Sequence, residues 1–132
     1  MKVIIYEDFS HKRKISLPLG AYFNQKGVKS EFAFNVSQIE KILEKESYVI
    51  THHRGPEDSK DMLRLKEKFP KATFIGFSSF VSSPTGLNKK TVKEMEEVYD
   101  HTIGYLEATK EYLIPDFYAL DKIFEKGVSE KW

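Results

Sequence analysis

Acidic and imidazole side chains directly follow two of the most apolar stretches of this sequence. Glu7 and Asp8 follow the run Val3–Tyr6, and His52 and His53 follow the run "YVIT". Paired carboxylates supply the oxygen ligands that hard cations prefer, whereas an imidazole beside them suits zinc, nickel or iron. One hypothesis is therefore a metal site formed by Glu7, Asp8 and His52. The other is an exposed acidic loop beside a hydrogen-bonded His52 and a solvated His53.

Hydroxyl side chains follow a third apolar run. Ser78 and Ser79 begin a stretch, Ser78–Asn88, that is rich in serine and contains a Pro-Thr-Gly turn signal. Such hydroxyls could bind a phosphate group, although they more often supply turn and cap hydrogen bonds. The sequence has no glycine-rich phosphate loop and no nucleophile paired with a base at a specific spacing, so it assigns no catalytic residue.

Composition limits the classes of partner. The chain has 132 residues, 21 Lys plus Arg against 20 Asp plus Glu, a net charge of +1 and no cysteine. A nearly neutral chain has no overall field to attract nucleic acid or an anionic membrane, and no segment approaches the roughly 18 apolar residues of a membrane span. We expect one cytoplasmic domain over residues 1–127 with a short tail at 128–132, no membrane association and no nucleic-acid partner.

Strand and helix patterns alternate along the chain, which predicts an α/β fold. The expected strands are Val3–Tyr6, Glu31–Val36, Tyr48–His52, Ala72–Phe77 and Thr102–Leu106. The expected helices cover Ile15–Gly27, a segment after the capping box Ser37–Glu40, Pro56–Phe69, a segment after Asn88 through Tyr99, and Asp116–Gly127. These units predict a doubly wound, flavodoxin-like parallel sheet of order 2-1-3-4-5. Glu7, Asp8, His52 and His53 would then converge at the carboxyl edge, with Ser78 and Ser79 beside them.

In this arrangement the chain resembles the receiver domain of two-component response regulators. The segments "VIIYED", "YVITHH" and "TFIGFSS" look like the family's first, third and fourth strands, and "GYL" followed by Pro115 resembles the end of its fifth. The resemblance implies magnesium binding at Glu7 and Asp8. It places His52 where the family has its phosphoacceptor aspartate and Ser78 at the family's hydroxyl residue.

The chain departs from the receiver family at a second position. The family's lysine before proline is Ile114 here, and an apparent insertion before Pro115 suggests that Lys110 could reach the site from another place. A receiver without its phosphoacceptor implies a degenerate form, or pseudo-receiver.

Two functions remain open. The first is a stand-alone pseudo-receiver that regulates through protein contact without Asp phosphorylation and needs no cofactor. Its interaction face would include Tyr99, Tyr105 and Tyr112, and its partner would be another protein or a second copy in a homodimer. The alternative is a metal-dependent enzyme or metal-binding protein, for example a phosphoester hydrolase, that uses a divalent cation in the crevice.

Overall fold

A single parallel sheet forms the centre of the molecule. The computed structural model describes residues 2–8, 13–43, 47–53, 55–78 and 89–128. The sheet order is β2-β1-β3-β4-β5, and every neighbouring pair is parallel. The strands are β1 (Lys2–Tyr6), β2 (Ser30–Ala33), β3 (Ser47–His52), β4 (Thr73–Phe77) and β5 (His101–Ile103). The predicted flavodoxin-like α/β fold and strand order are confirmed.

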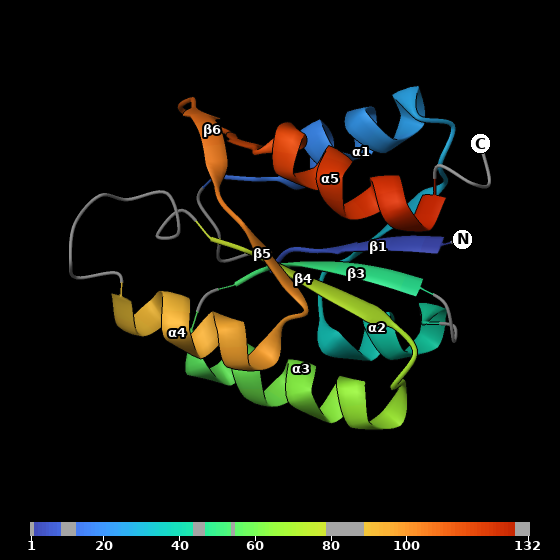
Figure 1. The fold of residues 1–132 in the computed structure, drawn as a ribbon, viewed down its shortest axis with the longest axis vertical. Coiled ribbons are helices and arrows are strands. Elements are labelled where there is room, and N and C mark those ends of the chain that lie inside the picture. Colours follow the sequence, from blue (N-terminus) through green and yellow to red (C-terminus); the bar gives the residue numbers. More distant parts are fainter. Residues whose placement is uncertain (1, 9–12, 44–46, 54, 79–88, 129–132) are drawn as a thin grey trace.

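Helices cover both faces of this sheet. They are α1 (Ser16–Gln25), α2 (Val36–Ile42), α3 (Pro56–Lys68), α4 (Lys89–Val98) and α5 (Phe117–Val128). Figure 1 shows α1 and α5 on one face and α2, α3 and α4 on the other. Because parallel strands need crossover connections, both faces become buried, which explains why the central strands β1, β3 and β4 are mostly apolar and buried.

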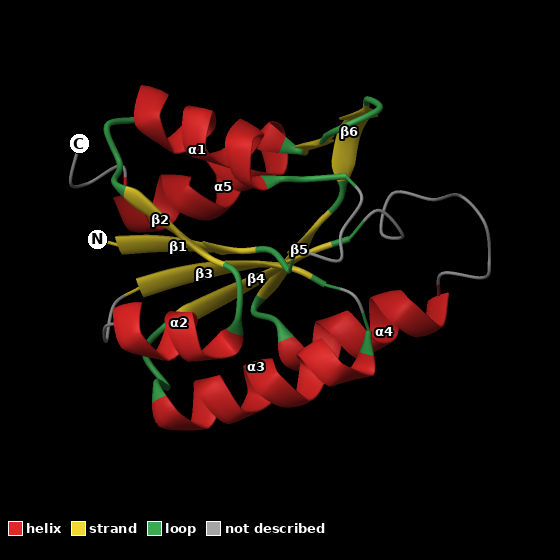
Figure 2. Cartoon of the chain, turned by 180° about the vertical axis from the view of Figure 1, so that it is seen from behind, coloured by secondary structure: helices red, strands yellow, loops and turns green. Residues whose placement is uncertain are grey.

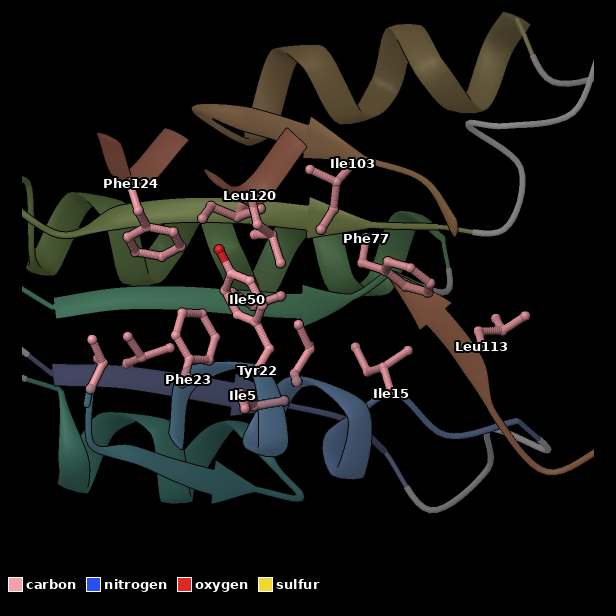
Figure 3. Packing of buried hydrophobic residues seen from close by; sticks show 14 residues of the cluster. Ile5, Ile15, Tyr22, Phe23, Ile50, Phe77, Ile103, Leu113, Leu120 and Phe124 are labelled. Carbon is pink, nitrogen blue, oxygen red and sulfur yellow. The ribbon is translucent and has the colours of Figure 1, made fainter. Parts of the chain in front are cut away.

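Two apolar clusters fill the space between the sheet and its helices. The first lies under α1 and α5 and contains Ile5, Phe23, Ile50, Phe77 and Phe124 among others (Figure 3). The second lies on the α2, α3 and α4 side and is built from the alternate strand residues together with side chains such as Met62 and Met95. Since successive strand residues point to opposite faces, this division fixes which face each site residue occupies.

A hairpin follows the sheet where a single strand was predicted. The expected strand Thr102–Leu106 is divided at Gly104 into β5 and β6 (Tyr105–Ala108), and β6 pairs antiparallel with β7 (Leu113–Pro115). The Gly104 carbonyl accepts a hydrogen bond from Asp116 N at 2.9 Å, which closes the base of the hairpin. The predicted insertion before Pro115 is therefore a two-stranded hairpin, and Figure 1 shows it projecting from the layer of α1 and α5.

The end of β2 and the start of α2 differ from the predictions, whereas the start of α5 agrees with them. Strand β2 stops at Ala33, and Asn35 caps α2 by accepting from Gln38 N at 2.9 Å, so the cap lies two residues before the predicted Ser37. The Gln38 side chain also accepts from Phe34 N at 2.7 Å, one residue before the N-cap, which differs from the reciprocal bond of a capping box. Helix α5 begins as predicted, with Asp116 accepting from Ala119 N at 3.1 Å.

Some predictions fall partly outside the described part of the chain. Helix α5 continues through Gly127 to Val128, and the remaining tail, 129–132, lies outside the described residues. The Ser78–Asn88 loop is described only at Ser78. Among the helices in the described ranges, none is long and apolar enough to cross a membrane.

Candidate functional site

Glu7 holds the beginning of helix α1. Its side chain is buried, and its carboxylate accepts from Ile15 N at 2.5 Å, from Ser16 N at 3.2 Å and from the Ser16 hydroxyl at 2.8 Å. The residue at the N-cap position, Ile15, has no side chain that could do this. A carboxylate at a helix N-terminus satisfies free N–H groups and interacts favourably with the helix dipole. Glu7 is therefore a helix cap supplied from eight residues earlier in the chain.

Asp8, the second predicted acidic ligand, is half-buried next to this cap. Its backbone carbonyl accepts from Lys14 Nζ at 3.3 Å, which brings a cation to the place where a metal ion was predicted. Among the described residues, no group of three or more His, Cys, Asp or Glu side chains could hold a metal ion. The Glu7, Asp8 and His52 metal site remains a prediction, and a metal ion there would compete with the start of helix α1 for the Glu7 carboxylate.

His52 lies beside Glu7 at the carboxyl edge of the sheet. Tyr6 pairs with Thr51 in the register of β1 and β3, so the next residues, Glu7 and His52, end adjacent strands. His52 is buried, and its ring meets Phe77 edge-on with centroids 5.1 Å apart. The structure thus places these two predicted site residues next to each other.

Apolar side chains fill the space on this side of the edge. Ile15, Phe77 and Leu113 belong to the first cluster and lie together near the carboxyl ends of the strands (Figure 3). Leu113 reaches this position because the β7 backbone pairs with the segment before α1: Leu113 N donates to Lys14 O at 3.1 Å. Ser78 is buried next to β5, with its N–H donating to Ile103 O at 3.3 Å. The hairpin therefore contributes an apolar side chain to the predicted crevice.

His53 faces the opposite side of the sheet, so the prediction that it joins this crevice is wrong. It belongs to a polar cluster that we define as His53, Tyr99, Glu94 and Ser59, in which all but the partly exposed Glu94 are buried. His53 Nδ1 lies 2.8 Å from the Tyr99 hydroxyl, and Nε2 lies 3.3 Å from Glu94 Oε1. Ser59 donates to the same Glu94 oxygen at 2.9 Å. The cluster joins the end of β3 to α3 and α4.

Tyr99 lies at one end of this cluster and is buried, which corrects its predicted role in an exposed interaction face. Burial raises the pKa of the Tyr99 hydroxyl, and the nearby Asp58 carboxylate raises it further. A hydroxyl that keeps its proton can donate to His53 Nδ1, so that Nε2 donates to Glu94. This arrangement satisfies both ring nitrogens.

Gly76 makes room for the Tyr99 ring. A Cβ at position 76 would lie 2.7 Å from Cγ of Tyr99, closer than two carbon atoms can approach. The ring can therefore lie directly on the β4 backbone only because residue 76 has no side chain.

The remaining predicted residues lie at the hairpin or outside the described residues. Lys110 is exposed in the hairpin turn. Tyr105 and Tyr112 are half-buried on the hairpin, and Tyr112 N donates to the Thr109 hydroxyl oxygen at 2.9 Å. Ser79 lies outside the described residues.

Sequence reasoning did not identify Glu94 and Ser59 as partners of His53. Both lie on helices whose residues were assigned only as packing or as a helix start, and nothing in their local spacing relates them to position 53. Tyr99 gave a usable signal, because it follows Met95 and Val98 at helical spacing, and both of these are buried against the sheet.

No protein-family model matches the chain, and no curated protein matches it in sequence. Two solved structures share its fold. One, from Burkholderia pseudomallei K96243, is described provisionally as pilus assembly-related; it has a TM-score of 0.63 and 9% identity, over 98% of this chain and 90% of that chain. The other, from Burkholderia thailandensis E264, is described provisionally as a pilus assembly protein (CpaE); it has a TM-score of 0.58 and 12% identity, over 97% of each chain. At such identities the likeness shows the fold alone.

Proposed function

We propose that this chain is a receiver-like regulatory module that acts by contacting another protein and is not switched by phosphorylation of an aspartate. One observation carries the proposal: the carboxylate of Glu7 caps α1 while position 52, beside it, holds an imidazole. An acyl phosphate needs a carboxylate to form, and the three hydrogen bonds to Glu7 occupy most of the oxygen lone pairs that magnesium would need.

The apolar edge of the sheet supports the same proposal. Leu113 and Ile15 pack beside Phe77 in the first cluster, where a phosphoryl group would need polar contacts. Removing such side chains from contact would cost the hydrophobic free energy of their burial. The scaffold is retained, while this edge is better suited to packing than to phosphate chemistry.

The proposed contact surface is the β6–β7 hairpin with the beginning of α5. Tyr105 and Tyr112 lie on the hairpin, and Leu106 and Tyr118 are large apolar side chains that are 48% and 72% exposed. Aromatic side chains with a polar end are suited to protein interfaces. The two fold neighbours are described provisionally as pilus-assembly proteins, and a role as a binding module within an assembly is compatible with those descriptions.

Partner binding by matched variants tests the proposal. The tagged full chain is cross-linked in its native cells, the retained protein is identified and purified, and its affinity is measured by titration calorimetry. We expect the double variant with Tyr105→Ala and Tyr112→Ala to bind the partner roughly tenfold or more weakly, because a few aromatic residues supply most of the binding free energy of an interface. His52→Ala should leave the affinity within about threefold, because the crevice does not contact the partner.

The control is Leu63→Ala, which removes an apolar side chain that is 45% exposed on α3, away from the hairpin. It should bind like the unmodified chain. Loss of binding by His52→Ala together with full binding by the double tyrosine variant would contradict the proposal and indicate a functional crevice.

A further inference from the structure

Strand β2 forms one open edge of the sheet. Among the described residues, no strand pairs with its outer side, and Figure 2 shows it on the near side of the sheet between α1 and α2. Val3 N donates to Lys29 O at 3.4 Å, and Glu7 N donates to Ala33 O at 3.1 Å. The backbone N–H and C=O groups of the odd-numbered residues of this segment therefore point toward β1. By the alternation of a strand, the backbone groups of Ser30 and Phe32 point outward. They form a template for a further strand.

The surface beside this edge is apolar on the α1 side. Phe32 is 45% exposed although it lies on Gly20, whose Cβ, if present, would be 3.0 Å from the end of the Phe32 ring. Leu17, one turn earlier on α1, is 61% exposed, and Ala21 beside it is exposed. A glycine and an alanine allow another helix or ring to approach α1 closely. An exposed aromatic ring next to unpaired strand groups is a pairing surface unless something covers it.

The charges on β2 indicate what could cover it. Lys29 is exposed, and Glu31, which is 33% exposed, makes a long 3.8 Å contact with Lys2. Both side chains lie on the α2 side, one residue on each side of Ser30. An antiparallel copy of the same strand, centred on Ser30, would place each Lys29 opposite a Glu31. The edge is therefore complementary to itself.

We propose that this chain forms a symmetric dimer in which the β2 edges of two copies pair antiparallel, with Ser30 opposite Ser30 of the second copy. The two Ser30 residues exchange N–H and C=O hydrogen bonds, and the Phe32 N–H of each chain donates to Val28 O of the other. Phe32 then packs against Val28 on the α1 side, and two Lys29–Glu31 pairs form on the α2 side. A continuous ten-stranded sheet results.

The charges also select this register over its neighbour. Shifting the register by two residues, so that Ser30 lies opposite Phe32 of the second copy, would place the two Glu31 side chains directly opposite each other. Like charges in this position are destabilising. Centring the pair on Phe32 places Glu31 opposite Ala33 and forms no ion pair. The dimer does not depend on the proposed partner-binding function, because it uses the edge of the sheet opposite to β5.

Charge reversal tests the dimer by sedimentation equilibrium of the full chain, from about 1 µM to 1 mM, the range of weak to ordinary protein complexes. We expect the unmodified chain to show a reversible monomer–dimer equilibrium. Lys29→Glu and Glu31→Lys should each weaken dimerisation by roughly tenfold or more, because two symmetric pairs change from attraction to repulsion. The double variant, with both reversals, restores opposite charges and should dimerise within about threefold of the unmodified chain.

Two further variants separate this edge from other causes. Ser30→Pro removes only an outward-facing N–H, so it should abolish dimerisation while the monomer stays folded by circular dichroism. Lys60→Glu makes the same change in net charge on exposed α3 and should have no effect. A monomer at all concentrations, or a dimer that survives Ser30→Pro and both single reversals, would overturn the proposal.

Discussion

Removing the Glu7 carboxylate should destabilise the fold through helix α1. In Glu7→Ala, the N–H groups of Ile15 and Ser16 and the Ser16 hydroxyl all lose their acceptor. Loss of an N-cap costs about 0.5–2 kcal/mol, and leaving a buried donor unsatisfied costs about 1–3 kcal/mol. Because Glu7 is only 3% exposed, water cannot easily replace it. We therefore expect the free energy of unfolding to fall by about 2–4 kcal/mol, a large share of the ~5–15 kcal/mol of an ordinary domain.

Glu7→Gln is the matched variant for this prediction. Its amide oxygen can still accept from Ile15 and Ser16, and the Ser16 hydroxyl can turn to accept from the amide. We expect a loss of about 1 kcal/mol, mainly the favourable interaction of the charge with the helix dipole. Denaturant unfolding followed by circular dichroism, with and without magnesium, measures both values. Equal losses in the two variants would refute the capping role, and stabilisation by magnesium that Glu7→Gln abolishes would show a metal ligand instead.

Three other changes test separate parts of the structure. Gly76→Ala should lower the free energy of unfolding by about 1–3 kcal/mol, measured by denaturant unfolding, because the new methyl group collides with the Tyr99 ring. The hydroxyl of Tyr22 donates to Asp121 and holds the pKa of that carboxyl below its usual range. Asp121→Asn should therefore be less stable than the unmodified chain at neutral pH, and this difference should vanish as the pH falls through the lowered pKa, as thermal unfolding across pH would show. His52→Asp should make magnesium raise the melting temperature more than it does in the unmodified chain, because a third carboxylate joins the acidic pair; equal shifts would mean that residue 52 does not face that pair.

The alternation of strands and helices could be predicted because it depends on local patterns, and the order 2-1-3-4-5 is the usual topology of such doubly wound sheets. The runs that became β1, β3 and β4 are mostly apolar at their centres, as expected for strands buried on both faces, and the segments between them have helical spacing. The hairpin could not be recognised in the same way. Gly104 interrupts the expected fifth strand, and β6 is exposed at three of its four positions, so the alternation that identifies a half-buried strand is absent.

The contacts of the candidate site were harder to predict than the strands and helices. Opposite directions for His52 and His53 follow from the two-residue period of a strand, and the structure places them on opposite faces. Glu94 lies 41 positions from His53, and Ile15 lies eight positions from Glu7. These contacts form only after the chain has folded, so local spacing does not indicate them. The burial of Tyr99 was accessible from the helical stripe before it, yet tyrosine's frequent role in interfaces favoured the wrong interpretation.

The central claim is that the chain works without an aspartyl phosphate, and intact-mass spectrometry tests it most directly. The full chain is incubated with acetyl phosphate and magnesium, beside a receiver domain that accepts phosphate as the positive control. We expect the positive control to gain one phosphoryl group while this chain keeps its unmodified mass, since position 52 offers no carboxylate. A phosphoryl group found on Asp8, His52 or His53 would contradict the account and indicate a phosphorylation switch.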